Sequence, residues 1–352
     1  MKFSRKQVAI AVGLVLTSLL IVVFVSSREN SSNPAAPSPS PTLIPSSDIE
    51  KVEARDLPFQ VDLPSVTTKG RLVFATYRRT ALGSMDVTGE NFAALTPQEF
   101  LYIEQVSWSP DGSRAVIKAH GNRTALLRDG KLSEINKEIR NVEWAPDNRR
   151  FAYTYGKTNL PHVFNSDTRT FRRLANKPLG SAFAWSPDGS RIATYEKADV
   201  STDGGTLRIV EVGSGELVET GATNVISSRW NNESKRMAIT QVKNSLPVLG
   251  ILDPGSGKTQ ETKLPGFADK GAWLSGETFL VASAESVETD YLTNPKPVAD
   301  RLWRIDSEGS VVELAAFDDE VRTARLLGQK LILVTDTEII RVDITDTKSD
   351  NA

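Results

Sequence analysis

The strongest constraint on the fold is a short segment that recurs along the chain with small changes. VSWSPDGSRAVI around Trp108, VEWAPDNRRFAY around Trp144 and FAWSPDGSRIAT around Trp185 are copies of one unit. Weaker copies lie at Trp230 and Trp273, so consecutive tryptophans are 36, 41, 45 and 43 residues apart. A period of about 40 residues is typical of a propeller in which each repeat forms one four-stranded blade. The repeat therefore predicts an all-β propeller.

The strand after each tryptophan turn can be aligned even in copies that lack the tryptophan. Its seven copies are RLVFA, RAVIK, RFAYT, RIATY, RMAIT, TFLVA and KLILV, which begin at Arg71, Arg114, Arg150, Arg191, Arg236, Thr278 and Lys330. β-Branched and aromatic residues dominate these segments, as expected for strands. Seven blades are therefore favoured, with six as the alternative.

The turn after each tryptophan reads Pro-Asp-Gly or a variant. Proline pre-sets φ and glycine tolerates positive φ, so we expect a hairpin between the first two strands of a blade. We expect Asp111, Asp147 and Asp188 to hydrogen-bond their own turns rather than bind a metal. Each tryptophan is expected to pack between neighbouring blades.

Closure of the ring needs a strand from outside the last repeat. The final copy, Leu331 to Ile344, has no clear fourth strand, and the first copy lacks a tryptophan strand. The segment FQVDL, Phe59 to Leu63, alternates apolar and polar residues and is the expected closing strand, since pairing with the terminal blade would remove an exposed sheet edge. The sequence thus predicts a propeller over residues 58–346 and a disordered tail over 347–352.

The segments WSPDGSRAVI and WSPDGSRIAT resemble the signature of the TolB-like, WD40-like (PD40) propeller repeats, and repeats cover Arg71 to about Asp346. This resemblance implies the propeller fold, which serves as a binding platform in many unrelated contexts. The copies at Trp230 and Trp273 depart from the pattern. The stretch from Ser46 to Ser65 is too short for the additional N-terminal domain of TolB, so the resemblance implies a relative of its propeller.

The N-terminus has the pattern of a membrane anchor. Three cations within residues 1–7 precede an uncharged run, residues 8–25, which would form a helix about 27 Å long and nearly span a hydrocarbon core. A cleaved signal peptide usually has a shorter apolar region, although Val25 and Ser27 would suit a signal peptidase. The positive-inside bias predicts a single-pass protein of the plasma (inner) membrane, with a cytoplasmic N-terminus and an extracellular or periplasmic propeller. Secretion after cleavage is the alternative.

Residues 26–57 are predicted to be a linker. Five prolines lie between Ser26 and Ser47, and almost nothing there can be buried in a core. Proline at this density favours extended, semi-rigid conformations, so the segment should hold the folded part away from the bilayer.

Charge and composition argue against several functions. The chain has 42 Lys plus Arg against 44 Asp plus Glu and no basic block after residue 28, so nucleic acid is not a predicted partner. It has no cysteine, and we expect both histidines, His120 and His162, to be isolated surface or loop residues. The stretch DPGSGKT, Asp253 to Thr259, looks like a phosphate loop but occupies a hairpin position in its repeat, so no nucleotide or other cofactor is predicted.

The binding face is predicted from loop length. If the strands of a blade are named a to d, the b-to-c loops share one face of the ring with the links between blades. We call this face of the ring the b-to-c face, and the opposite face the a-to-b face. The long b-to-c loops are Lys157 to Pro161, Ala198 to Gly205, Lys243 to Pro247 and Ser283 to Asp300. Long loops on a rigid scaffold often carry function, although neutral length variation is the alternative. The predicted contact residues are Arg78, Lys157, His162, Lys243 and Tyr291.

These observations predict a non-catalytic module that binds a protein or peptide partner in the cell envelope. No catalytic or metal-binding residue is predicted. The alternative is an enzyme of the glycosidase or lyase type that uses acidic residues in the propeller channel.

The predicted anchor can be tested by mass. Because the apolar run is long, we expect protein isolated from membranes to retain residues 8–25. Intact-mass or N-terminal analysis checks this, and a chain that begins at Arg28 would contradict it.

Overall fold

The computed structural model describes residues 49–53, 61–96, 100–196, 204–288, 291–292, 298–336 and 338–344. The predicted cytoplasmic segment 1–7, anchor 8–25 and tail 347–352 lie outside these residues, as does the linker apart from 49–53. Within the described ranges, no helix is long and apolar enough to cross a membrane.

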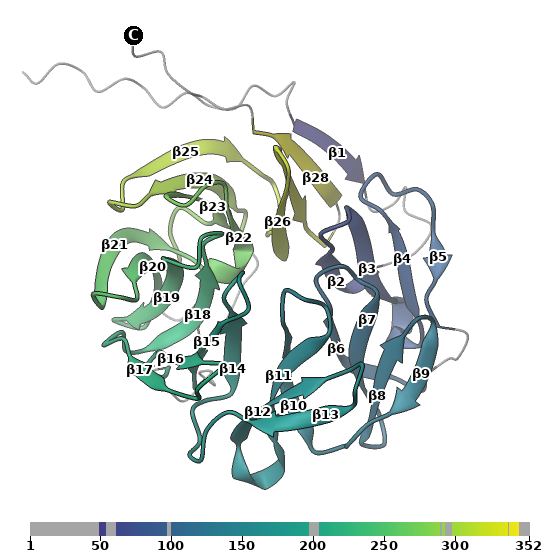
Figure 1. Cartoon of the computed structure of the whole chain (residues 1–352). Coiled ribbons are helices and arrows are strands. Elements are labelled where there is room, and N and C mark those ends of the chain that lie inside the picture. The colour runs from purple at the N-terminus through teal and green to yellow at the C-terminus, as the bar shows by residue number, and fades with distance from the viewer. Residues whose placement is uncertain are drawn as a thin grey trace, which may run out of the picture. The chain divides into compact units, whose positions relative to one another are not determined.

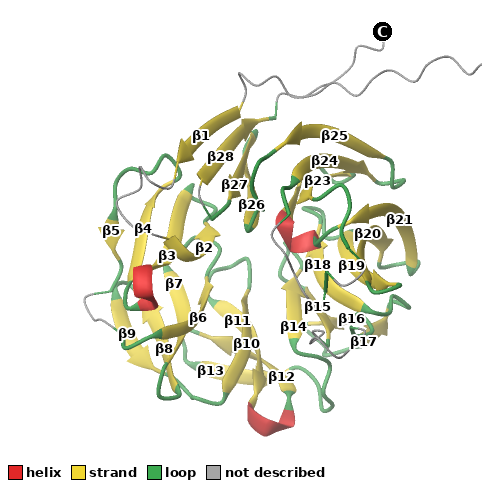
Figure 2. Cartoon of the chain, turned by 180° about the vertical axis from the view of Figure 1, so that it is seen from behind, coloured by secondary structure: helices red, strands yellow, loops and turns green. Residues whose placement is uncertain are grey.

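The described strands form seven four-stranded antiparallel sheets arranged as blades around a ring (Figures 1 and 2). Blade 1 contains β2 (Val61–Val66), β3 (Arg71–Thr76), β4 (Leu82–Asp86) and β5 (Ala93–Ala94); blade 2 contains β6 (Ile103–Trp108), β7 (Arg114–Ala119), β8 (Arg123–Arg128) and β9 (Lys131–Glu134); blade 3 contains β10 (Ile139–Trp144), β11 (Arg150–Tyr155), β12 (Leu160–Asn165) and β13 (Thr170–Arg173).

The same order continues around the ring. Blade 4 contains β14 (Ala182–Trp185), β15 (Arg191–Tyr195), β16 (Arg208–Glu211) and β17 (Leu217–Glu219); blade 5 contains β18 (Val225–Trp230), β19 (Met237–Lys243), β20 (Leu246–Asp253) and β21 (Lys258–Pro265); blade 6 contains β22 (Gly271–Trp273), β23 (Thr278–Ser283), β24 (Arg301–Asp306) and β25 (Val311–Ala316); blade 7 contains β26 (Thr323–Leu327), β27 (Lys330–Val334), β28 (Glu338–Asp343) and β1 (Ile49–Glu53). Three short 3-10 helices, η3 (Tyr77–Arg79), η4 (Gly156–Thr158) and η5 (Ala268–Lys270), lie between strands.

The seven-blade prediction and the alignment of the second strands are confirmed. Six of the seven second strands begin at the predicted residue, and β19 begins at Met237, one residue later than predicted. The stretch from Asp253 to Thr259 is a hairpin between β20 and β21, as its repeat position indicated.

The predicted closing strand is wrong. Val61 to Val66 forms β2, the innermost strand of blade 1, which pairs with β3 and replaces the missing tryptophan strand. Blade 7 is completed instead by β1, which pairs with β28 over five residues from Ile49 to Glu53 (Figure 1). Ring closure thus uses a strand within the range that had been predicted as linker.

Tryptophans connect consecutive blades, as predicted. Trp144, Trp185, Trp230 and Trp273 are buried, and each indole reaches the innermost strand of the preceding blade. Their Nε1 atoms donate to the backbone oxygens of Ser107 (2.9 Å), Glu143 (3.0 Å), Ala184 (2.9 Å) and Arg229 (3.2 Å), respectively. Each acceptor immediately precedes the tryptophan of its own blade, so the contact repeats from blade to blade. Trp108 Nε1 is buried without a hydrogen-bond partner.

The turns also follow the prediction. Asp111, Asp147 and Asp188 each accept a backbone N–H from two residues further along their own turn, at 3.0, 2.9 and 3.0 Å. The fourth residue after the tryptophan has positive φ in four copies: 72° at Gly112, 59° at Asn148, 68° at Gly189 and 60° at Ser234. The backbone conformation therefore persists where glycine is replaced.

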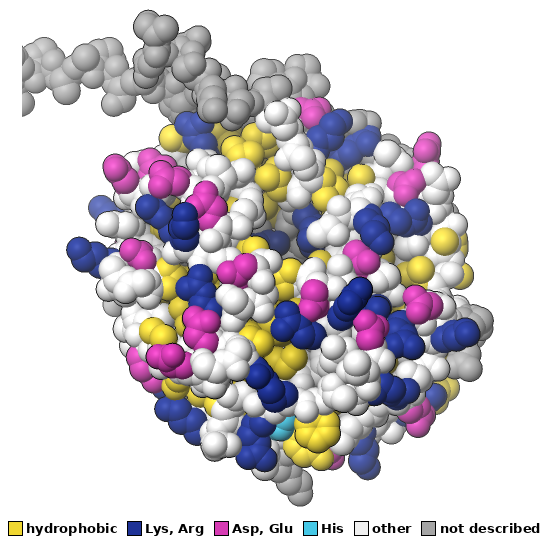
Figure 3. All heavy atoms as spheres, viewed as in Figure 1, with side chains coloured by type: hydrophobic (Ala, Val, Ile, Leu, Met, Phe, Trp, Pro, Cys, Tyr) yellow, Lys and Arg dark blue, Asp and Glu magenta, His cyan; other side chains and the backbone are white. Residues whose placement is uncertain are grey.

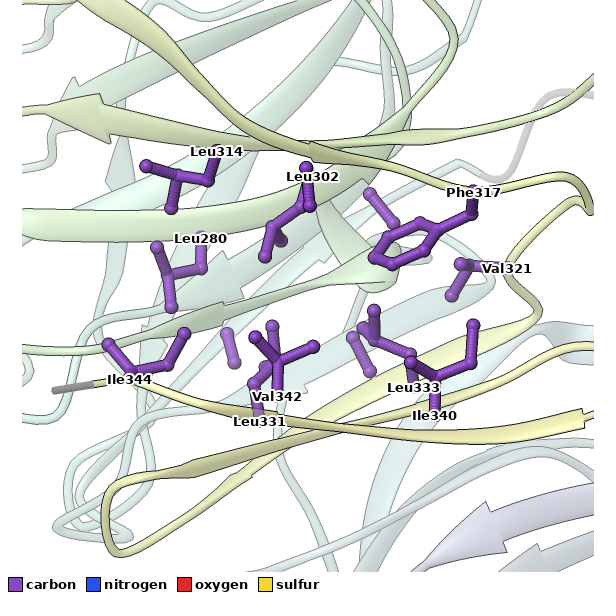
Figure 4. Packing of buried hydrophobic residues seen from close by; sticks show 14 residues of the cluster. Leu280, Leu302, Leu314, Phe317, Val321, Leu331, Leu333, Ile340, Val342 and Ile344 are labelled. Atoms are coloured by element: carbon purple, nitrogen blue, oxygen red, sulfur yellow. The ribbon is translucent and has the colours of Figure 1, made fainter. Parts of the chain in front are cut away.

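Apolar side chains fill the spaces between neighbouring sheets. In one cluster, Leu280 and Leu302 of blade 6 pack with Leu331, Leu333 and Ile340 of blade 7 (Figure 4). Because each sheet buries its faces against two neighbours, the blades depend on one another for stability.

Trp185→Ala tests this packing. Trp185 is 8% exposed and donates to Glu143 O, so its removal should lower the free energy of unfolding by about 3 to 5 kcal/mol. The control Trp185→Phe keeps an aromatic ring but loses the hydrogen bond, and should cost less. Denaturant titration measures both, and equal, small shifts would show that the indole contributes little.

Candidate functional site

The five predicted contact residues lie at the b-to-c ends of their blades. Arg78 is exposed in η3, and Lys157 belongs to η4. His162 is near the start of β12, Lys243 ends β19, and Tyr291 belongs to the loop between β23 and β24. They come from blades 1, 3, 5 and 6. Their role in binding stays a prediction.

Lys243 and His162 have partners within their own blades. The Lys243 ammonium pairs with Glu261 on β21. His162 is 7% exposed, stacks on Tyr153 with ring centroids 5.3 Å apart, and places Nδ1 2.9 Å from Leu160 O. Burial lowers the pKa of His162. The prediction of a surface or loop position is thus wrong for His162, because aromatic neighbours enclose its ring, whereas His120 lies exposed in a turn.

Tyr291 lies beside a buried ionic cluster that the sequence analysis missed. The Lys270 ammonium is 2.7 Å from Glu320 Oε1 and 3.5 Å from Asp300 Oδ2, while Asp300 Oδ2 also accepts the N–H of Val321 at 2.8 Å. Burial raises the pKa of Asp300, opposed by Lys270. Tyr291 and Lys270 help to line a cavity of about 10 Å³, room for about one water molecule. The cluster therefore joins loops of blades 5 to 7.

Exposed apolar side chains mark part of the b-to-c face. Leu101 is 87% exposed and Tyr102 44% exposed in the link between blades 1 and 2, and Tyr155 is 38% exposed at the end of β11. Strand direction places all three on this face. The Arg79 guanidinium lies over the Tyr102 ring, 5.6 Å from its centroid. In the described residues, the other exposed large hydrophobic side chains, Phe92, Phe171 and Val218, lie in or beside outer strands, and none lies in an a-to-b turn.

Charged side chains from three blades lie near the ring axis. Glu143, Arg229 and Arg325 occupy matching positions on the innermost strands of blades 3, 5 and 7. Arg229 Nη1 donates to Asp269 O at 3.2 Å, to Gly271 O, and to Ala324 O at 3.4 Å on blade 7. Arg325 Nη1 donates to Val66 O of blade 1 at 3.2 Å. Figure 3 shows a hollow near the centre of one face, with Lys or Arg side chains beside it.

Glu143 is the acid in this axial group. The Glu143 side chain is exposed to solvent at the ring axis. Protein atoms nevertheless lie around its carboxyl group and displace part of its water. Removal from bulk water raises the pKa of Glu143 to about 7, opposed by Arg229. A carboxyl group that titrates near neutrality could transfer protons. Among the described residues, no group of three or more His, Cys, Asp or Glu could hold a metal ion.

Comparison with known proteins shows the fold. No family model matches the chain, and no curated protein matches it. Tricorn protease has a TM-score of 0.56 at 13% identity, over 87% of this chain and 34% of its own. TolB from Acinetobacter baumannii has a TM-score of 0.48 at 16% identity, over 73% of this chain and 66% of its own. A putative TolB from Agrobacterium tumefaciens has a TM-score of 0.44 at 14% identity, over 72% of this chain and 94% of its own. At these identities the likeness concerns the fold alone.

The titration of Glu143 gives a pH prediction. Its pKa in the folded protein is about 7, above the ordinary value of 4.5, so the folded state binds the proton more tightly than the unfolded state. The contribution of protonated Glu143 to the free energy of unfolding is therefore complete below about pH 4.5, and it is lost as the pH rises from there through 7. Glu143→Gln should therefore raise the free energy of unfolding above pH 7, by at most about 1 kcal/mol because solvent screens the charge.

The same variant should behave like the parent below pH 4.5. Ser107→Ala, at the matching position of blade 2, is the control and should not change the slope of stability with pH. Denaturant midpoints across pH 4 to 9 measure the effect. Parallel profiles for the parent and Glu143→Gln would show that folding does not shift the pKa of Glu143, and would contradict the prediction.

Proposed function

We propose that this chain is a non-catalytic binding module that holds a protein or peptide partner on the b-to-c face of its propeller. The observation that carries the proposal is the exposure of Leu101, Tyr102 and Tyr155 on this face. Apolar and aromatic side chains supply much of the energy of protein interfaces, and tyrosine is common at their centres. Arg78 lies exposed on the same face, in blade 1, and would contribute to a polar rim.

We also propose that the propeller lies outside the plasma membrane, in the periplasm or the extracellular space, anchored by residues 8–25. The uncharged run and the cations before it support this placement. Because β1 begins at Ile49, 23 residues separate the end of this run from the propeller. A proline-rich segment of that length could extend about 70 Å. This reach would let the b-to-c face meet a partner away from the bilayer.

One observation favours the enzymatic alternative. Glu143 combines a pKa near 7 with a position at the ring axis, close enough to Arg229 for their charges to interact. Glycosidases use a pair of carboxyl groups about 5 to 10 Å apart. A hydrolytic activity that Glu143→Gln abolishes would support this alternative over the binding module.

Leu101→Asp tests the binding face. The full chain in native membranes would carry a photocrosslinking residue at Tyr155, and captured proteins would be identified and quantified by mass spectrometry. Leu101→Asp should lower capture of the specific partner by at least about tenfold, because it puts a charge into an apolar contact. The change should leave stability within about 0.5 kcal/mol, since Leu101 is exposed.

The matched control is Lys258→Asp, a charge change on the opposite face. It should leave capture unchanged. Loss of capture with Lys258→Asp but not with Leu101→Asp would place the partner on the a-to-b face and contradict the proposal.

A further inference from the structure

The outer strand of blade 3 differs in charge from the other outer strands. In the sheet order β10, β11, β12, β13, the last strand pairs only with β12, and all four of its residues are exposed. It contains Arg172 and Arg173 and no acid, and Arg169 lies in the turn before it. Among the seven outer strands that the structure describes, β5 has no charged residue and the other five each contain a Glu. Blade 3 therefore presents a basic sheet edge.

These arginines have no acidic partner in the described part of the chain. Arg169 Nη2 donates to Glu134 O at 3.1 Å, Arg172 Nη1 to Gly213 O at 3.1 Å, and Arg173 Nη1 to Asn176 Oδ1 at 3.2 Å. All three acceptors are neutral oxygens. The nearby carboxylate of Asp167 instead pairs with Arg114, Arg128 and Arg149. Three positive charges at this edge thus remain available to an anionic partner.

The centre of the same strand is apolar. Phe171 is 70% exposed and faces His162, with ring centroids 6.2 Å apart. Proteins protect sheet edges from pairing by placing charged residues on them, and the arginines alone would fit that role. An exposed phenylalanine has the opposite effect, because it favours contact with another apolar side chain. The edge therefore repels basic strands and attracts an acidic strand that carries an apolar residue.

A groove of about 640 Å³ runs beside β13. Arg150, Thr170 and Arg172 line it from blade 3, and the turns of blade 4 line it at Gly189, Glu211 and Gly213. Asp188 also lines the groove, and its carboxylate accepts bonds within its own turn. Side chains of a strand alternate between two sides. On β13, Thr170 and Arg172 therefore share one side and Phe171 and Arg173 share the other, next to Phe164 and His162 of β12, while Phe171 also borders the groove.

We propose that β13 accepts an extended acidic segment of a partner protein as a fifth strand of blade 3. Antiparallel pairing would place acidic residues opposite Arg173 and Arg172, an apolar residue opposite Phe171 and a small polar residue opposite Thr170. Backbone hydrogen bonds supply affinity in such strand addition, and the side-chain contacts supply specificity. This surface lies at the rim of the ring and is separate from the b-to-c face.

A synthetic peptide tests the proposal with the full chain. The probe is a fluorescent, capped peptide of about ten residues centred on Glu-Glu-Leu-Thr, measured by anisotropy at low and high salt. It should bind saturably and more weakly as salt rises, since salt screens the ion pairs. Phe171→Ser and the double variant Arg172→Glu with Arg173→Glu should each weaken binding by at least about tenfold.

Val218→Ser is the matched control. Val218 is 41% exposed in β17, the outer strand of the adjacent blade, next to Glu219. Peptide affinity should be unchanged by Val218→Ser and by Leu101→Asp. The arginine double variant should instead bind a Lys-Lys-Leu-Thr peptide more tightly than the parent does. Thermal unfolding of every variant checks that the propeller is intact.

Three outcomes would overturn the proposal: no saturable binding of the acidic peptide, equal loss with Val218→Ser, or no loss with the β13 variants. A peptide with N-methyl groups on the alternate residues whose N–H groups would point toward β13 gives a further test, because it cannot pair along that edge. If that peptide binds as well as the parent peptide, strand addition is wrong.

Discussion

The pairing of β1 with β28 is the contact on which the ring depends. The other blades take all four strands from one continuous stretch, whereas blade 7 combines Thr323 to Asp343 with Ile49 to Glu53. Without β1, blade 7 would end in the exposed edge of β28. Closure also places β1 on the outer edge of blade 7.

Within the closed ring, one contact between blades repeats at several interfaces, whereas the side chains at equivalent positions differ from blade to blade. The indole-to-carbonyl bond recurs at four interfaces with distances of 2.9 to 3.2 Å. By contrast, the innermost position before each tryptophan is Glu143 in blade 3, Ala184 in blade 4 and Arg229 in blade 5. Such variation at equivalent places is compatible with the fold, because the indole bonds use the backbone oxygens of these residues and not their side chains.

Blade 3 brings several of these differences together. It contributes Tyr155 to the b-to-c face, Glu143 to the ring axis and the basic strand β13 to the rim. The buried His162 connects two of these regions, since its ring contacts those of Tyr155 and Phe171. A partner that engaged the face and the rim together would gain affinity from both contacts. The cluster at Lys270, in contrast, uses its charges internally and holds loops of neighbouring blades in place.

The sequence by itself determined the blade repeat, the seven second strands and the turn geometry, because each depends on residues close together in the chain. It also placed the five predicted contact residues on one face, since strand direction follows from the hairpins. The tertiary structure alone decided that β1 closes the ring, that Lys270 meets Asp300 and Glu320, that His162 is enclosed by aromatic rings, and that Arg229 crosses to Ala324. Apart from the ring contacts of His162 with Tyr153, Tyr155 and Phe171, those contacts join residues far apart in the sequence. Their partners are selected by packing and charge after the ring has formed, which a local pattern does not encode.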